Sequence, residues 1–194
     1  MKRVFIIHGW EGSPEANWLP WLKRELESLD FEVYVPAMPQ TEHPVKKVWV
    51  EYLSNLVGTP DKNTYFVGHS IGCKAILRYL EMLPSEVKIG GALFVAGWIT
   101  LTHMDDRTEK ELEVIKDWIN PPFRFKDIKN HLNKSIAIFS NDDPYVPLEG
   151  NMETYKDKLD SKIFIEKNAG HFTGEEDGRT EYPIILDKFL SLIS

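Results

Sequence analysis

The sequence has one cysteine, no long apolar run and fewer basic than acidic residues, and each of these deficits excludes a class of protein. Because Cys73 is the only cysteine, the chain can form neither an internal disulfide nor a zinc site built on cysteine pairs. We therefore expect a reducing, cytoplasmic setting. With 30 acidic and 23 basic residues, a formal net charge of -7, no nucleic acid is expected as a partner, because a phosphate backbone attracts basic surfaces.

Membrane and export signals are also missing from the sequence. Residues 89–102 form the longest uncharged apolar stretch, but they include three glycines and fall short of the ~20 residues that a membrane-spanning helix needs. The apolar stretch after Lys2 and Arg3 covers only residues 4–7, whereas a signal peptide has an apolar core of about 7–15 residues. We expect a protein that neither enters a membrane nor is exported.

The length of 194 residues and the 42% of hydrophobic residues indicate one domain covering residues 1–194. Short β-branched or aromatic runs alternate with amphipathic helical patterns, which is typical of an α/β fold with a mostly parallel sheet and helices on both faces. Six strands are expected, at residues 3–8, 32–36, 64–69, 89–96, 135–140 and 162–166. Helices are expected at residues 18–29, at 45–56, after Ser70 and after Pro183.

The helix after Ser70 and the long connection after the fourth strand each show a pattern that predicts their structure. Helical periodicity directs Cys73 and the apolar positions after it inward, and it directs Lys74 and Arg78 outward to solvent. The connection covers almost 40 residues, and connections of this length usually carry structure or function of their own. A helical pattern at 109–119 predicts a small cap or loop insertion within residues 98–134; an ordinary crossover helix with a long loop is the alternative.

Residues 68–72, Gly-His-Ser-Ile-Gly, match the Gly-x-Ser-x-Gly pattern of a nucleophile elbow. In this turn a strand passes sharply into a helix and lifts the serine hydroxyl out of the sheet, so small residues are needed on both sides. A predicted strand ends at the motif and a predicted helix begins directly after it, as the elbow requires. Ser70 is therefore the candidate nucleophile.

A serine nucleophile needs a base that is itself oriented by a third group, and in α/β-hydrolases the acid and then the histidine follow later in the chain. Asp142 and Asp143 follow the fifth predicted strand, and His171 follows the sixth. Asp143 is preferred over Asp142, because Asp143-Pro-Tyr-Val-Pro fits the Asp-x-x-Val-Pro turn of many such enzymes. His171 is the candidate general base.

The remaining candidate roles concern the oxyanion and the substrate. Backbone N–H groups of Trp10, after the first strand, and Ile71, after the nucleophile, are candidates for an oxyanion hole. His8 is expected to brace the loop of Trp10. Trp98 either lines a substrate pocket or packs in the core. The histidines and carboxylates show no spacing typical of metal ligands, so neither a metal nor a cofactor is expected.

The chain resembles the small serine hydrolases typified by retinoblastoma-binding protein 9 and the bacterial YdeN-type hydrolases. The resemblance rests on motifs in chain order: His8-Gly9, Asn17-Trp18-x-x-Trp21-Leu22, residues 68–73, Pro122-Phe123-x-Phe125-x-x-Ile128, Asp142-Asp143-x-x-Val146-Pro147 and Gly170-His171-Phe172. It implies a trimmed, three-layer α/β-hydrolase fold, with Ser70, Asp143 and His171 as nucleophile, acid and base. It also implies esterase-like or peptidase-like activity on small substrates. The Leu-x-Cys-x-Glu motif behind retinoblastoma binding is absent around Cys73, so that partner is not expected.

These features predict a serine hydrolase that cleaves a small carboxylic ester or amide through an acyl-enzyme intermediate. One alternative keeps the site and changes the reaction to that of a thioesterase or acyl transferase. Another is a non-catalytic protein-binding module on a hydrolase fold, since a fold alone does not decide function. The sequence leaves the oligomeric state open.

Overall fold

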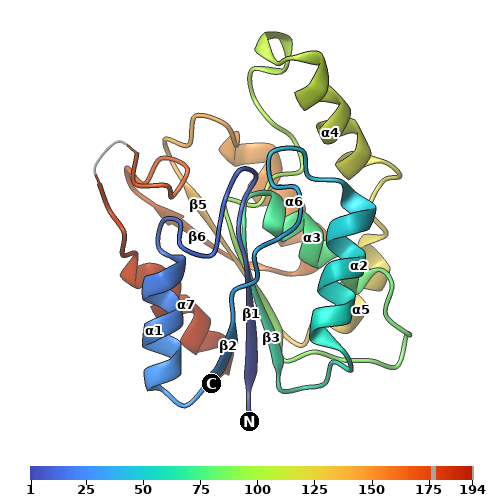
Figure 1. The fold of residues 1–194 in the computed structure, drawn as a ribbon, viewed down its shortest axis with the longest axis vertical. Helices are drawn as coiled ribbons and strands as arrows, with labels where there is room; N and C mark the ends of the chain where they lie inside the picture. The colour runs from blue at the N-terminus through green and yellow to red at the C-terminus, as the bar shows by residue number, and fades with distance from the viewer. Residues whose placement is uncertain (176–177, 194) are drawn as a thin grey trace.

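The computed structural model describes residues 1–175 and 178–193, and within these residues it contains a single six-stranded sheet in which every strand pairing is parallel. The strands are β1 (Arg3–Ile7), β2 (Glu32–Tyr34), β3 (Thr64–His69), β4 (Gly91–Val95), β5 (Ser135–Ser140) and β6 (Lys162–Glu166). Their order across the sheet is β2-β1-β3-β4-β5-β6 (Figure 1). The predicted α/β class and all six strands are confirmed.

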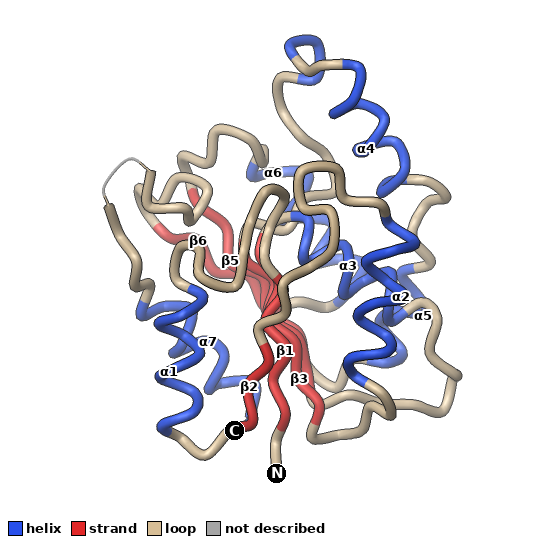
Figure 2. The backbone as a smooth tube through the Cα atoms, viewed as in Figure 1, coloured by secondary structure: helices blue, strands red, loops and turns tan. Residues whose placement is uncertain are grey.

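Helices cover both faces of the sheet and give the molecule three layers. They are α1 (Leu19–Ser28), α2 (Lys46–Val57), α3 (Ile71–Leu80), α4 (Glu109–Ile119), α5 (Phe125–His131), α6 (Leu148–Leu159) and α7 (Pro183–Ile193), with a short 3₁₀ turn η1 (Met104–Asp106). The two helices α1 and α7 lie on one face, and α2, α3, α5 and α6 lie on the other (Figure 2). None of the helices in the described part of the chain has the length and apolar character to cross a bilayer.

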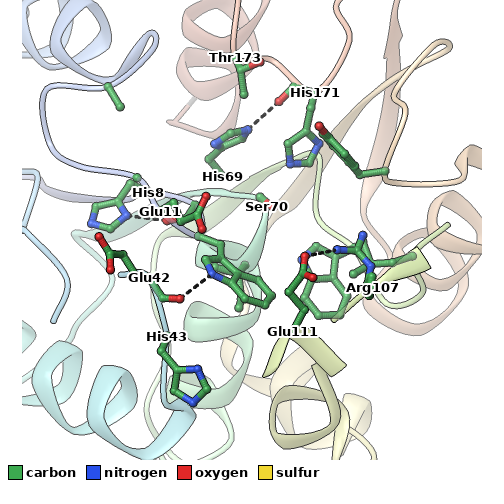
Figure 3. Close-up of a pocket in the computed structure, with 18 of the residues that line it drawn as sticks. His8, Glu11, Glu42, His43, His69, Ser70, Arg107, Glu111, His171 and Thr173 are labelled. Carbon is green, nitrogen blue, oxygen red and sulfur yellow. Dashed lines mark hydrogen bonds and ion pairs between the residues drawn. The ribbon is translucent and has the colours of Figure 1, made fainter. Parts of the chain in front are cut away.

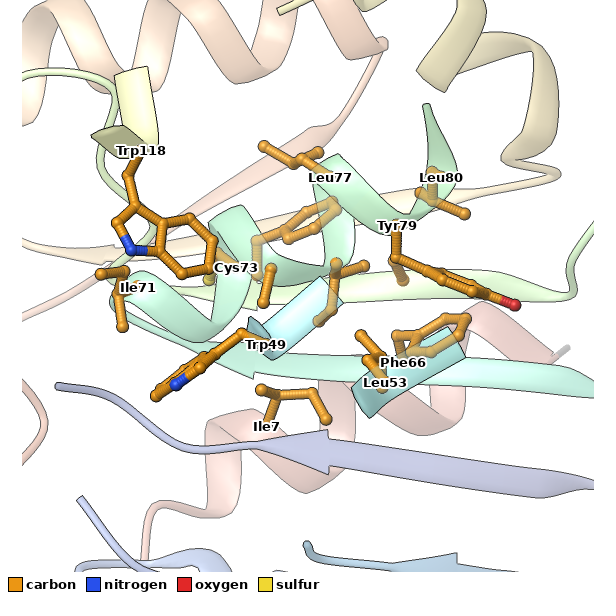
Figure 4. Packing of buried hydrophobic residues seen from close by; sticks show 14 of the residues in the cluster. Ile7, Trp49, Leu53, Phe66, Ile71, Cys73, Leu77, Tyr79, Leu80 and Trp118 are labelled. Carbon is orange, nitrogen blue, oxygen red and sulfur yellow. The ribbon is translucent and has the colours of Figure 1, made fainter. Parts of the chain in front are cut away.

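Two apolar clusters, one on each face, hold the layers together. Successive strand residues point to opposite faces, so Val4 of β1 packs toward α1 and α7 while Phe5 packs toward α2 and α3. Figure 4 shows part of the second cluster, to which Ile7 of β1, Trp49 of α2 and Leu77 of α3 all belong. The folded protein exposes 9375 Å², close to the ~9,500 Å² that surface scaling gives for a monomeric domain of this mass.

The structure corrects the sequence prediction for α3. Lys74 is fully buried and Arg78 is 6% exposed, although helical periodicity directs both to solvent. The cause is the connection after β4, because Trp98 and Phe123 of that connection pack over the side chains of Lys74 and Arg78. A helix that would be amphipathic on an open surface is therefore buried on every side.

The sequence prediction also missed α6, and the reason is Asn151. This polar residue is fully buried on the inner face of α6, together with Tyr155 and Leu159. Its side-chain oxygen accepts hydrogen bonds from the Ile99 and Thr100 backbone N–H groups at 2.6 and 3.0 Å. A buried asparagine in the apolar position breaks the periodic pattern from which a helix is predicted.

The connection after β4 carries η1, α4 and α5. A capping box starts α4, since Thr108 accepts from the Glu111 N–H and the Glu111 carboxylate accepts from the Thr108 N–H. The carboxyl-terminal half of α4 is anchored by Trp118, whose indole N–H donates to the Pro44 carbonyl at 2.7 Å. The amino-terminal half of α4 projects past the carboxyl ends of the strands (Figure 1). This is the edge of the sheet at which ligands of open α/β sheets bind.

Candidate active site

Ser70 lies in a strained turn between β3 and α3. Its φ of 53° and ψ of -120° are an uncommon conformation for a residue with a side chain, and strain of this kind concentrates at functional sites. The turn depends on the glycines on either side. A Cβ on Gly68 would lie 2.8 Å from the Cys73 backbone, and one on Gly72 would lie 2.3 Å from the Ile7 carbonyl oxygen. The Gly-x-Ser-x-Gly pattern thus has a steric origin in this fold.

Asp143 and His171 form a hydrogen-bonded pair, although 27 residues separate them in the sequence. The Asp143 Oδ2 atom lies 2.7 Å from His171 Nδ1, and the Asp143 side chain is 2% exposed. The other carboxylate oxygen accepts from the backbone N–H groups of Tyr145 and Val146 at 2.9 and 3.0 Å. Because Nδ1 faces the carboxylate as a donor, Nε2 of His171 is free to accept a proton.

Asp142 has a different set of partners. Among the described residues, no hydrogen bond or ion pair joins it to the His171 ring. Its Oδ1 accepts from the Ser140 hydroxyl at 2.5 Å and from the Gly170 N–H at 3.0 Å. The hydrogen bond from Ser140 is the main cause that lowers the pKa of Asp142, and it outweighs the opposite effect of burial. Asp142 therefore ties the loop that carries His171 to the end of β5.

His69, the residue before Ser70, holds the backbone of His171. Its Nε2–H donates to the His171 carbonyl at 2.8 Å, and the two rings lie 5.1 Å apart. Burial is the main cause that lowers the pKa of His69 to about 3, and the charge of a protonated His171 lowers it further. His69 is therefore a neutral donor at physiological pH, and sequence analysis missed this role because it depends on where the loop after β6 packs.

The loop after β1 brings Trp10 to the same edge of the sheet. His8 braces this loop, because its Nδ1–H donates to the Gly9 carbonyl at 2.8 Å and its Nε2 accepts from the Met38 N–H at 3.0 Å. Burial lowers the pKa of His8 and keeps the ring neutral, as this pair of contacts requires. Ile71 is the first residue of α3, where backbone N–H groups have no acceptor within the helix.

A cavity of about 910 Å³ brings most of the predicted residues together. Ser70, His171, Trp10, Ile71 and Trp98 all line it, whereas Asp143 lies behind His171. The connection after β4 closes another side of the cavity with Leu101, Arg107, Thr108, Lys110, Glu111 and Glu113. Figure 3 shows His171, Ser70 and the Arg107–Glu111 ion pair around this space. Trp98 is 2% exposed, so it packs in the core and also borders the cavity.

Tyr145 is a further lining residue that sequence analysis did not single out. Its ring meets the His171 ring edge to face at 5.3 Å and is 43% exposed. The sequence contained a signal for Tyr145, because this residue lies within the Asp-x-x-Val-Pro turn that indicated Asp143.

Comparison with known proteins assigns the family. The model of the family described as serine hydrolase matches residues 4–191. The chain belongs to the serine hydrolase family. It is 31% identical over 193 residues to YdeN of Bacillus subtilis, a protein named as a hydrolase, and the match covers 100% of this chain and 97% of the relative. The serine hydrolase RBBP9 of Rattus norvegicus is 25% identical over 177 residues, which cover 90% and 89% of the two chains.

Solved structures agree with this assignment. The crystal structure of the YdeN product of Bacillus subtilis matches the serine hydrolase with a TM-score of 0.87, at 31% identity, over 99% of this chain and 98% of that one. A structure from a study of carboxylesterases of Nitrososphaera gargenis has a TM-score of 0.69 at 15% identity and covers 99% and 90% of the two chains. The second likeness shows a shared fold alone.

Proposed function

We propose that the protein hydrolyses small carboxylic esters or amides, with Ser70 as nucleophile, His171 as general base and Asp143 as the group that orients His171. The observation that carries the proposal is the 2.7 Å contact between Asp143 and His171 behind a cavity that Ser70 and His171 share. A buried carboxylate in this position fixes the histidine tautomer and stabilises the imidazolium that forms during the reaction.

The proposed reaction has two steps. Ser70 Oγ attacks the carbonyl carbon while His171 Nε2 takes the hydroxyl proton, and the backbone N–H groups of Ile71 and Trp10 donate to the oxyanion. Collapse of the tetrahedral intermediate breaks the bond to the alcohol or amine, which leaves with the proton from His171. In the second step, water activated by His171 attacks the acyl-enzyme, and the carboxylic acid and free Ser70 are released.

The lining of the cavity supports an uncharged substrate. Trp98 supplies an apolar wall, and the projecting half of α4 acts as a cap over the site. Among the lining residues, the carboxylates Glu11, Glu42, Glu111, Glu113 and Glu175 outnumber the cations Arg107 and Lys110. This excess of negative charge disfavours anionic substrates.

An active-site-directed fluorophosphonate tests the nucleophile directly. The wild type should be labelled at Ser70, and Ser70→Ala should not be labelled, because the alanine has no oxygen to form the adduct. Hydrolysis of p-nitrophenyl butyrate should fall by at least about a thousandfold in the same variant, as triad losses usually do. Equal labelling of the two proteins contradicts the assignment of Ser70.

The same labelling, combined with assays on oxygen esters and acyl thioesters, separates the alternative functions. Labelling of the wild type together with turnover of acyl thioesters, but not of oxygen esters, identifies a thioesterase. Absence of both labelling and turnover in a correctly folded wild type identifies a non-catalytic module on the hydrolase fold.

A further inference from the structure

A buried amine lies one helical turn after Ser70 and has no part in the proposed reaction. Lys74 is fully buried in α3, and its Nζ has no hydrogen-bond partner within residues 1–175 and 178–193. Isolated buried charges are expensive, and lysine is almost never fully buried without a partner. The position of Lys74 therefore calls for an explanation.

The neighbours of Lys74 are aromatic rings of the connection after β4. Its Nζ lies 4.0 Å from the centre of the Trp98 ring and 4.9 Å from the centre of the Phe123 ring. An ammonium group within about 6 Å of a ring face is attracted to it, most strongly for tryptophan. Trp98 also lines the cavity of Ser70, so Lys74 contacts the residue that forms the wall of the site.

Arg78, one further turn along α3, fastens the other end of the same connection. Its guanidinium lies 3.8 Å from the centre of the Phe123 ring, and its Nη2 donates to the carbonyls of Trp118 and Pro121 at 3.0 and 2.6 Å. Arg78 is also paired with Glu81 at 2.9 Å, whereas the Lys74 amine faces the two rings and has no hydrogen-bond partner in the described part of the chain. Through two buried cations, α3 thus holds both ends of the connection after β4.

We propose that Lys74 is a positioning residue for substrate selection, because its ammonium group fixes the Trp98 indole in the wall of the Ser70 cavity and so limits the size of the acyl group that fits. This inference rests on the proposed function. Without the ammonium group, the indole keeps its packing but loses the attraction that holds it in one orientation, and the cavity can admit longer acyl chains.

The charge of Lys74 is adjustable near neutral pH. Burial is the main cause that lowers the pKa of Lys74 to about 7; the nearby Arg78 guanidinium lowers it further and the Cys73 thiol raises it. The connection that packs against Lys74 contributes aromatic rings, Trp98 and Phe123, rather than charges at this contact. The attraction for the Trp98 ring is therefore strongest in the protonated state, below this pKa.

The substitution Lys74→Met tests the inference, because methionine is an unbranched apolar residue of similar length. At pH 6, where the Lys74 amine is charged, the ratio of kcat/KM for p-nitrophenyl octanoate to that for the acetate should rise at least fivefold in Lys74→Met, mainly through a lower KM for the octanoate. Lys47→Met on α2 is the matched control, since the Lys47 side chain is 80% exposed and its ion pair is with Glu51 of the same helix. It should leave the ratio unchanged, and Lys74→Arg should restore part of the preference of the wild type.

A double-mutant cycle with Trp98→Phe shows whether Lys74 acts through the indole. If it does, Lys74→Met changes the ratio much less in the Trp98→Phe background than in the wild type, because the partner is already altered. An unchanged ratio in Lys74→Met, or a change of the same size in both backgrounds, overturns the inference.

Fluorescence distinguishes failure of the inference from failure of the proposed function. The emission of Trp98, taken as wild type minus Trp98→Phe, should titrate with a midpoint near pH 7, and this transition should be missing in Lys74→Met. Titration without any ester turnover or labelling contradicts the proposed function and leaves the contact intact. Turnover and labelling together with an unchanged octanoate-to-acetate ratio in Lys74→Met contradict the role of Lys74 and leave the proposed function intact.

Discussion

Two adjacent aspartates, Asp142 and Asp143, differ in the groups with which their carboxylates form hydrogen bonds. Asp143 orients the His171 ring through Nδ1, whereas Asp142 accepts from the Gly170 N–H and so holds the backbone beside that histidine. In the proposed reaction the first contact acts on the group that moves the proton, and the second acts only on the position of that group. The two side chains are chemically identical, so the difference between them lies entirely in which partner each one meets.

Replacing each aspartate by asparagine separates the two roles. Asp143→Asn should lower kcat by about three to four orders of magnitude, because the amide cannot stabilise the imidazolium and favours the wrong tautomer of His171. Asp142→Asn should lower kcat by roughly tenfold or less, since its carbonyl oxygen can still accept from the Gly170 N–H. The measurement is the steady-state hydrolysis of p-nitrophenyl butyrate by both variants. An Asp142→Asn loss as large as that of Asp143→Asn contradicts this division.

Residues with local sequence signals could be predicted, and residues whose role depends on loop packing could not. The elbow around Ser70 and the Asp-x-x-Val-Pro turn are short motifs whose residues follow from the backbone geometry that they form. His69 and Asp142 act through contacts to the loop after β6, which lies more than 25 residues away in the sequence. Nothing within their own segments indicates which backbone group they will meet.

Among the elements, the strands were predictable because buried parallel strands are short, continuous apolar runs with breaks on both sides. The predicted and observed bounds are identical for β3, β5 and β6. The prediction of helices depends on the periodicity of apolar residues, and this signal failed at α6. There Asn151 occupies an inward position and forms hydrogen bonds with the backbone of residues 99 and 100. A polar residue that holds another loop cannot be distinguished from a surface residue by pattern alone.

The contact between α3 and β1 determines where the elbow lies, and Gly72→Ala tests it. A Cβ at this position would lie 2.3 Å from the Ile7 carbonyl and 2.7 Å from the His8 carbonyl, so the two elements must move apart. We expect a loss of about 1–3 kcal/mol in the free energy of unfolding and slower labelling of Ser70. Urea denaturation and labelling rates measure the two effects.

Gly150→Ala is the control for this substitution, because Gly150 lies on α6 and, outside the neighbouring backbone of that helix, no heavy atom of the described residues lies within 4 Å of its added Cβ. Since alanine favours the helix, this variant should be neutral or up to about 1 kcal/mol more stable. Equal stability of Gly72→Ala and the wild type would show that α3 does not depend on its close approach to β1.

For the molecule as a whole, the long connection after β4 changes the character of α3. Periodicity assumes that one face of a helix meets the sheet and the other meets water. Here residues 98–134 return over α3, and both of its faces are buried. The sequence reveals the length of the connection but not the place where it packs, so the burial of Lys74 could not be predicted. The cost of that burial falls on the stability of the entire fold.

This cost predicts how global stability depends on pH. The pKa of Lys74 is lowered to about 7 in the folded protein, against about 10.4 for lysine in an unfolded chain. Above pH 10.4 the amine is neutral in both states and costs nothing. Between pH 10.4 and 7 the unfolded chain binds the proton and the folded protein does not, so folding stability falls as the pH falls, by up to about 1.4 kcal/mol per pH unit. Below pH 7 the cost stays constant.

Lys74→Met removes this dependence, and urea denaturation at pH 6 to 10 measures it. The free energy of unfolding of the variant minus that of the wild type should increase steadily as the pH falls from 10 to 7, by roughly 4 kcal/mol, and level off below pH 7. A change in the apolar packing of this side chain moves the whole curve without changing its slope, because that packing does not involve protons. Lys47→Met should show a flat difference over the same range, since Lys47 is exposed. A flat difference for Lys74→Met as well would mean that the Lys74 amine keeps its ordinary pKa in the folded protein and that burial does not favour its neutral form.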